Sequence, residues 1–243
     1  MKIFGVTDKG KKRIINEDSF LIHLGDEEKY AFAVVCDGMG GANGGEVASA
    51  LAVEVIKSQF DTIDSYPKRS QWGKLLRKMV AEANNQIFLK SCGDNTLSGM
   101  GTTMVGFFCN GSKVTIANVG DSRAYLISEE DIKQITKDHS LVNELIEKGE
   151  LSVAQAYKHP NKNVITRALG VEANVQCDLY DVNVSKGQYI LLCSDGLTEE
   201  VSEPEIHFEV VNSNSVEEAC NALIALANSR GGHDNISVVI CEF

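Results

Sequence analysis

Four aspartates lie at the ends of apolar runs in this sequence, and their positions suggest a shared chemistry. Asp37 follows "AFAVVC", Asp121 follows "TIANVG", Asp195 follows "YILLCS" and Asp234 precedes "ISVVI". If these runs are strands that meet at one rim, the carboxylates raise one another's pKa and cost stability, so a cation must resolve the conflict. Because the candidate ligands are all oxygens, the preferred ions are Mg²⁺ or Mn²⁺.

Each aspartate taken alone is more readily explained as a turn residue, because Asp-Gly and Asp-Asn are common turn dipeptides. Four such acids together favour an ion site. Glycines support it, since Gly38, Gly40 and Gly41 let the backbone approach an ion or a phosphate closely, and the Gly38 carbonyl is itself a candidate ligand. Two nucleotide motifs fail: "GVTDKGKK" has Lys12 where a P-loop needs a hydroxyl, and "GMGGANGG" fits no dinucleotide fingerprint.

Strands and helices must bring these residues together. Apolar and β-branched runs predict strands at 30–36, 102–109, 113–120, 123–127, 188–194 and 236–243. Apolar residues at helical spacing predict helices at 44–60, 71–90 and 216–227. Short turns such as "NGSK" favour antiparallel pairing, and helices grouped between sets of strands indicate an α+β layered sandwich. The stretch 138–170 has only short helix-like pieces and is typical of an inserted, mobile segment.

Composition restricts the class of protein. The 243 residues, 43% of them hydrophobic and without linker composition, predict a single domain over 1–243. A formal net charge of −11 disfavours a nucleic-acid partner, because most of the surface would repel a phosphate backbone. No apolar run is long enough for export or for a membrane span, so we expect a cytoplasmic protein with no membrane partner.

The seven cysteines point to a reducing compartment. Cys36, Cys109, Cys193 and Cys241 each end or nearly end an apolar run, where small buried thiols are expected. No C-x-x-C pair occurs, which disfavours structural zinc, and no cysteine has an arginine six places later, as a thiolate phosphatase loop requires.

Eight blocks of the chain together resemble the PPM (PP2C-type) family of metal-dependent serine/threonine protein phosphatases, in its compact bacterial form. They occur in the family's order and cover nearly the whole chain. The blocks are "RIINEDSF" (13–20), "VVCDGMGGANGGEVAS" (34–49), "GMGTTMV" (99–105), "IANVGDSRAYLI" (116–127), "ITKDHSLV" (135–142), "VITRALG" (164–170), "LLCSDGLTEEV" (191–201) and "GGHDNISVVI" (231–240). The resemblance implies a four-layer α-β-β-α sandwich of two antiparallel sheets flanked by helix pairs, with a flap over about 141–165.

The resemblance also implies a ligand set. Asp37 would bridge two metal ions, the Gly38 carbonyl would bind one of them, and Asp195 and Asp234 would bind the other. In similar bacterial enzymes the acids at the positions of Asp121 and Asp195 hold a weaker third ion beside the flap.

Three residues near the N-terminus complete the implied site. Glu17 and Asp18 would hold metal-bound waters, and Arg13 stands at the family's phosphate-binding position. A guanidinium grips two phosphate oxygens at once, which a lysine cannot reproduce. For Lys11 and Lys12 the simpler interpretation as a solvated basic run holds.

The implied activity is hydrolysis of phosphoserine and phosphothreonine monoesters on proteins. Two ions would supply a shared water of lowered pKa as the nucleophile, so no phosphoenzyme would be needed. Ser194 and Cys193 are therefore interpreted as strand residues, because no activating base is apparent beside them.

One departure concerns the proton donor. Many eukaryotic relatives carry a histidine where this chain has Met39, which cannot donate a proton to the leaving oxygen. Water, another group or the metals alone must serve instead. His139 and His233 are candidates, although a structural hydrogen-bonding role fits each of them at least as well.

Two other functions stay open at this point. One is a non-catalytic scaffold, which degenerate ligands would signal, and none is visible. The other is a regulatory phosphatase dedicated to one partner protein, although such relatives usually carry extra sensor or membrane domains. The family leads us to expect a monomer whose partners are phosphoproteins, including a cognate Ser/Thr kinase and that kinase's targets.

Overall fold

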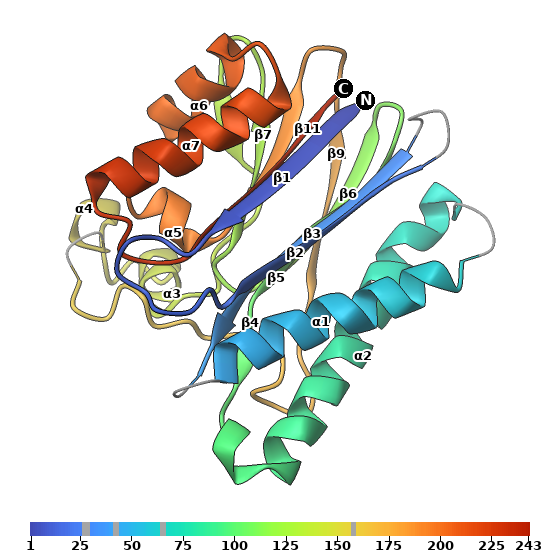
Figure 1. The fold of residues 1–243 in the computed structure, drawn as a ribbon, viewed down its shortest axis with the longest axis vertical. Helices are drawn as coiled ribbons and strands as arrows, with labels where there is room; N and C mark the ends of the chain where they lie inside the picture. The colour runs from blue at the N-terminus through green and yellow to red at the C-terminus, as the bar shows by residue number, and fades with distance from the viewer. Residues whose placement is uncertain (26–29, 41–43, 64–66, 157–158) are drawn as a thin grey trace.

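The computed structural model describes residues 1–25, 30–40, 44–63, 67–156 and 159–243, which form four layers (Figure 1). Two antiparallel sheets lie back to back. Outside one sheet lie α1 (Gly44–Asp61) and α2 (Arg69–Gly93), and outside the other lie α6 (Glu203–Asn212) and α7 (Val216–Arg230). The predicted α-β-β-α sandwich is confirmed.

Every strand pairing between the named strands is antiparallel. In the described residues, one sheet has the order β1 (Lys2–Asp8), β11 (Ile236–Glu242), β10 (Tyr189–Cys193), β7 (Arg123–Ile127) and β8 (Ile132–Gln134). The second sheet has the order β2 (Asp18–Leu24), β3 (Tyr30–Met39), β5 (Met104–Asn110), β6 (Lys113–Val119) and β9 (Asp178–Asn183), and the short β4 (Gly101–Thr102) pairs with the end of β3. Because β1 pairs with β11, the two chain termini lie side by side (Figure 1).

Alternating side chains build three apolar layers between these elements. On β3, Phe32 and Val34 pack in the cluster under α1 and α2, whereas Ala33 and Val35 pack between the two sheets. The third layer fills the space between the other sheet and α7, where Leu223 is fully buried. A strand buried on both faces carries an unbroken apolar run, which is why β3 was recognisable from the sequence.

The predicted helices correspond to α1, α2 and α7, and the six predicted strands correspond to β3, β5, β6, β7, β10 and β11. The patterns missed β1, β2, β8 and β9, and these four are the edge strands of the two sheets. Most of their residues are only half-buried, so they lack a continuous apolar run. Helix α6 was also missed, although Ser202 and Glu205 form a capping box at its start.

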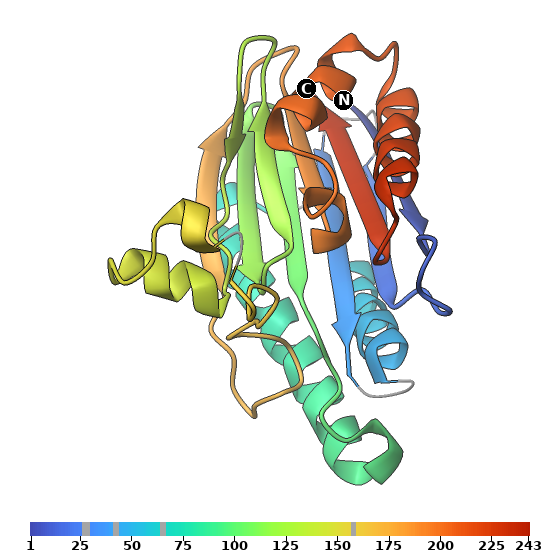
Figure 2. The ribbon, with the colours of Figure 1, turned by 90° about the vertical axis from the view of Figure 1, so that its left-hand side faces the viewer.

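Residues 141–165 leave the sheets as α3 (Leu141–Glu147) and α4 (Val153–Ala156), and both helices project from one side of the sandwich (Figure 2). The segment begins and ends at one place, because a bridge pairs Ser140 with Ile165. As predicted, the described residues of this segment form no long strand. Two further short helices are η2 (Asn95–Leu97) and α5 (Asp195–Thr198).

Cys36, Cys109, Cys193 and Cys241 are fully buried, as predicted, and no disulfide joins them. Among the described residues, no helix has the length and apolar character needed to cross a membrane. Gly41 lies outside the described residues, so its predicted approach to a ligand stays a prediction.

Candidate active site

Strands β2 and β3 place two of the predicted acids side by side, because Asp18 and Asp37 are direct partners in the ladder. Asp37 lies inside β3 and not beyond its end, a correction to the sequence interpretation. Two threonines fix its backbone. The Asp37 N–H donates to Thr103 Oγ1 at 3.0 Å, and its carbonyl accepts from Thr102 Oγ1 and from the Thr103 N–H, both at 2.8 Å.

The other acids reach Asp37 from separate elements. Asp195 is the first residue of α5, separated from β10 by Ser194, and its carboxyl group lies close enough to Asp37 for the two to interact. Asp121 follows β6, and Asp234 precedes β11 by one residue. All of them, together with Asp18, are close enough to Asp37 to raise its pKa through their charges. The structure therefore brings the four predicted aspartates together, while their roles as ligands stay predictions.

The titration of these acids is strongly perturbed. Burial raises the pKa of Asp18 to about 7, of Asp121 to about 8 and of Asp195 to about 6, and the charge of a neighbouring carboxylate adds to each shift. Burial, followed by the charge of Asp18, also raises the pKa of Asp37 well above its ordinary value of 3.8. Near neutral pH these carboxyl groups therefore retain protons more readily than ordinary aspartates do. A bound cation would take the place of those protons.

The donor set fits a hard divalent ion by its chemistry. The buried Asp18 Oδ1 has no hydrogen-bond partner, while Oδ2 accepts from Ser194 Oγ at 2.7 Å. As they stand, no three His, Cys, Asp or Glu side chains in the described part of the chain are arranged to hold an ion. Burial and mutual charge raise the pKa values of Asp37 and Asp195, and a divalent cation can take the place of the protons once both groups ionise.

Glycines at this end are required by close packing of the backbone. A Cβ atom on Gly38 would lie 2.1 Å from the Gly45 carbonyl oxygen, so β3 approaches the first turn of α1 too closely for any side chain. A Cβ atom on Gly45 would likewise collide with the Glu17 carboxylate, whose pKa is raised, chiefly by burial. Packing thus accounts for Gly38, and its carbonyl as a ligand stays a prediction.

Arg13 lies beside the carboxylates and is 47% exposed. Its Nη2 atom donates to Asp234 Oδ2 at 2.8 Å, and its Nη1 atom is 3.8 Å from Glu17 Oε2. These two acids hold the guanidinium at the rim while half of its surface stays open to a ligand. That geometry is compatible with phosphate binding, the role that the resemblance implies.

Asn235 is a site residue that the sequence reasoning missed. It is 3% exposed, its Nδ2 donates to the carbonyls of Lys9 at 2.9 Å and Ile15 at 3.0 Å, and its Oδ1 accepts from the Glu17 N–H at 2.8 Å. It therefore fastens the loop that carries Arg13. The only signal was its place after Asp234 in "GGHDN".

The two histidine candidates for proton donation are both engaged elsewhere. His139 is buried, its Nδ1 accepts from the Gly120 N–H at 3.0 Å, and its Nε2 lies 3.2 Å from Asp178 Oδ2. Burial lowers the pKa of His139, so the ring is neutral and supports the turn before Asp121. His233 Nδ1 is hydrogen-bonded to Glu200 at 2.5 Å.

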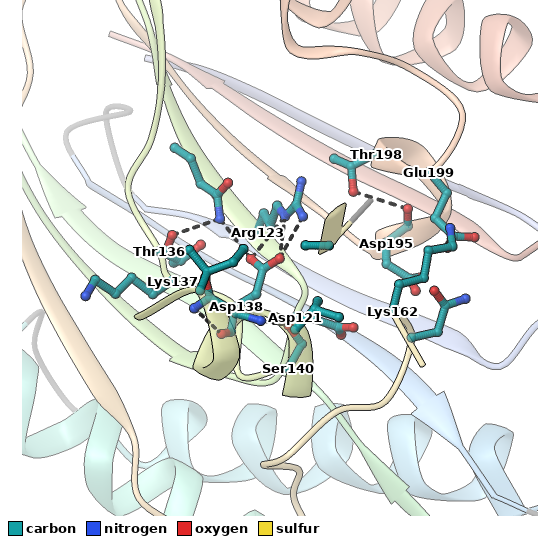
Figure 3. A pocket seen from close by; sticks show the side chains of 16 residues that line it. Asp121, Arg123, Thr136, Lys137, Asp138, Ser140, Lys162, Asp195, Thr198 and Glu199 are labelled. Atoms are coloured by element: carbon teal, nitrogen blue, oxygen red, sulfur yellow. Dashed lines mark hydrogen bonds and ion pairs between the residues drawn. The ribbon is translucent and has the colours of Figure 1, made fainter. Parts of the chain in front are cut away.

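A cavity of about 570 Å³ adjoins the acids on the side of α3 and α4 (Figure 3). Asp121 and Asp195 lie on its wall together with Lys162, which forms an ion pair with Glu199 at 2.9 Å. Asp138 also faces the cavity but is turned toward Arg123 (Figure 3). The cavity thus lies between the site acids and the described part of residues 141–165.

Met39 is not among the residues that line this cavity; it lines a second cavity of about 460 Å³ with Arg167 and Val171. The Met39 side chain cannot donate a proton, because its thioether carries none.

Comparison with known proteins decides the family. A family model described as protein phosphatase 2C matches residues 8–225. The chain belongs to the protein phosphatase 2C family. The serine/threonine phosphatase stp of Listeria welshimeri is 41% identical over 236 residues, covering 97% of this chain and 93% of that protein.

Solved structures agree with this family. The structure of serine/threonine phosphatase Stp1 from Staphylococcus aureus has a TM-score of 0.94 at 35% identity and covers 100% of this chain and 94% of its own. The catalytic domain of the serine/threonine protein phosphatase PstP in complex with two manganese ions has a TM-score of 0.85 at 32% identity, with 99% and 97% covered. The chain is therefore a protein serine/threonine phosphatase that acts on phosphoproteins, and the family relies on divalent metal ions.

Proposed function

We propose that this phosphatase hydrolyses phosphoserine and phosphothreonine monoesters with two divalent ions, Mg²⁺ or Mn²⁺, held by the carboxylates around Asp37. The observation that carries the proposal is that Asp18, Asp121, Asp195 and Asp234 converge on Asp37, where burial and mutual charge raise the pKa values of Asp18, Asp37, Asp121 and Asp195. The similarity to PstP with two manganese ions supports the same donor chemistry.

Each residue would have a distinct part in holding the ions. Asp37, the Gly38 carbonyl, Asp195 and Asp234 would be direct ligands. Glu17 and Asp18 would hold water, and Asp121 with Asp195 would hold a weaker third ion. When bound, the ions would supply an acidified water and positive charge against the phosphate oxygens.

Arg13 would bind the phosphate of the substrate. Its guanidinium is kept at the rim by Asp234 and Glu17, and its exposed half can donate two parallel hydrogen bonds to phosphate oxygens. The arginine thereby orients the phosphoryl group before reaction and neutralises part of its charge.

Water is the nucleophile in this proposal, and no phosphoenzyme forms. Ser194 Oγ is fully buried and donates to Asp18, so it is not accessible to a phosphoryl group. Cys193 is fully buried as well, and burial raises the pKa of its thiol to about 12. The engagement of His139 and His233 in other hydrogen bonds favours water as the proton donor to the leaving oxygen.

We further propose that residues 1–243 work as one catalytic unit, with 141–165 as a flap beside the site. The partners would be phosphoproteins, including a cognate Ser/Thr kinase and its targets, and the enzyme would work as a monomer.

A metal-depletion experiment tests the proposal. Protein treated with EDTA should release no phosphate from a phosphothreonine peptide, and added Mn²⁺ should restore release. Acid quenching during turnover of a ³²P-labelled peptide should leave no label on the protein. Full activity in EDTA, or a stable labelled protein, would contradict the proposal.

A further inference from the structure

The loop between β1 and β2 exposes two apolar residues directly after Arg13. Ile14 is 89% exposed, the highest value for a large hydrophobic side chain in the described residues, and Ile15 is 37% exposed. Single exposed apolar side chains are common on protein surfaces and need no explanation by themselves. What distinguishes this pair is its place beside the proposed phosphate-binding arginine and the way in which the loop is held.

Hydrogen bonds fasten the loop on both sides of Ile14. The Lys11 and Lys12 N–H groups donate to the Gly232 carbonyl at 2.8 and 3.2 Å, and the Ile15 carbonyl accepts from Asn235 Nδ2 at 3.0 Å. These hydrogen bonds therefore hold the backbone on both sides of Ile14 in place, while its side chain stays exposed. A preorganised apolar contact of this kind loses less conformational entropy when a ligand binds.

The same loop gathers positive charge on an acidic protein. Lys9, Lys11 and Lys12 are exposed, and none of them forms an ion pair within the described residues, although the whole chain has a formal net charge of −11. Unpaired lysines at the mouth of a site attract acidic groups over several ångströms. Their charge therefore complements an acidic ligand.

We infer that residues 9–15 dock the segment of the phosphoprotein that flanks the phosphorylated residue. Ile14 and Ile15 contact an apolar side chain there, and the lysines favour acidic residues farther along. This inference rests on the proposed function, because Arg13 must first hold the phosphate. Consecutive Cα atoms are about 3.8 Å apart in both chains, so a residue next to the phosphorylated one comes within reach of Ile14.

A peptide scan tests the apolar contact. Phosphothreonine peptides with a glycine background carry one leucine, placed in turn at each of the two positions before and after the phosphothreonine. For the wild-type enzyme with Mn²⁺, leucine at one of these positions should raise kcat/KM roughly 10-fold over glycine, as partial burial of an aliphatic side chain predicts. Ile14→Ser should bring this ratio close to 1, and Ile14→Leu should keep it.

Matched variants serve as controls. Phe208 is 61% exposed on α6, so Phe208→Ser removes an exposed apolar group elsewhere and should leave the leucine ratio unchanged. The double variant Lys11→Ala, Lys12→Ala should lower the preference for a glutamate-containing peptide about 3-fold at low salt. Lys133→Ala, at an exposed position on β8, should not.

The outcomes separate the inference from the function on which it rests. Metal-dependent release with no leucine preference overturns the inference alone, and absence of release from every peptide overturns both. If Ile14→Ser lowers kcat/KM equally on all peptides, the loop is only structural and the inference fails. It also fails if the leucine profile is flat and Ile14→Ser abolishes binding to phosphatidylglycerol vesicles, because the loop then docks on a membrane.

Discussion

Two groups of aspartates lie near each other in the sandwich, and their negative charge is compensated in different ways. Asp138 and Asp178 are paired with arginines, whereas the acids around Asp37 face one another. Both carboxylate oxygens of Asp138 accept hydrogen bonds from Arg123, Oδ1 from Nε at 3.0 Å and Oδ2 from Nη2 at 2.7 Å. Asp178 is hydrogen-bonded to His139 Nε2 and pairs with Arg167 Nη1 at 3.0 Å, and these two contacts outweigh burial and lower its pKa. Around Asp37 the pKa values are raised.

The difference indicates what each group is for. A carboxylate with an arginine partner is satisfied within the chain and stabilises the loops that it joins. Carboxylates that face one another cost stability until a proton or a metal ion relieves the repulsion. The chain carries that cost around Asp37, which is where the proposed chemistry takes place.

The largest expected effect comes from removing the central acid. Asp37→Asn should lower kcat/KM for a phosphothreonine peptide by roughly 10³-fold or more, because an electrostatic centre of the reaction is lost. The metal-free variant should be at least as stable as the wild type, since a repelled charge is gone. Its melting temperature should no longer rise with Mn²⁺.

Asp131→Asn is the control for this prediction, because Asp131 is exposed on the turn before β8. That variant should keep both the activity and the response to Mn²⁺. Substantial turnover by Asp37→Asn would remove the contrast between the two groups.

Breaking the paired group should affect stability instead. Arg123→Ala leaves Asp138 without its partner and should lower the free energy of unfolding by about 3 kcal/mol, measured by urea denaturation. Arg69→Ala, at an exposed position, should change it by less than about 0.5 kcal/mol. Adding Asp138→Asn to Arg123→Ala should recover part of the loss, and no recovery would show that the charge pair is not its cause.

Arg13 combines features of the two groups, because it is an arginine that pairs with acids of the proposed site. Arg13→Ala should raise KM for the peptide roughly 10-fold, as the loss of a charge-assisted hydrogen bond predicts. Because the side chain is 47% exposed, the free energy of unfolding should hardly change. An unchanged KM would eliminate the phosphate-binding role.

The smallest effect concerns pH in the presence of a chelator. The folded-state pKa values of Asp18, Asp121 and Asp195, about 7, 8 and 6, exceed the ordinary value of 3.8. Between pH 4 and pH 8 the folded chain thus holds protons that the unfolded chain has released, so stability falls as pH rises.

We expect the melting temperature in EDTA to be several degrees lower at pH 8 than at pH 6 on account of these groups. Mn²⁺ should raise it more at pH 8, where fewer protons compete. The Asp121→Asn variant should show a weaker dependence on pH in EDTA. An equal dependence in that variant and the wild type would contradict the raised pKa of Asp121.

The interior of the fold was predictable, and its edges were not. All six strands predicted from the sequence lie inside a sheet or bury both faces, whereas β1, β2, β8 and β9 are edge strands. An edge strand exposes part of its surface, so polar residues interrupt its apolar pattern. The exposure of Ile14 was equally unpredictable from the sequence. No local pattern tells whether an isoleucine is buried in the core or, as here, 89% exposed.

The sequence by itself determined the inner strands, three helices and the chemical identity of the acids, since periodicity and side-chain type are local properties. Only the tertiary structure decided which acids face one another and which pair with an arginine. Asp18 meets Ser194 across 176 residues and Arg13 meets Asp234 across 221. A pKa depends on such neighbours in space, because burial and Coulomb forces act through distance and not along the chain.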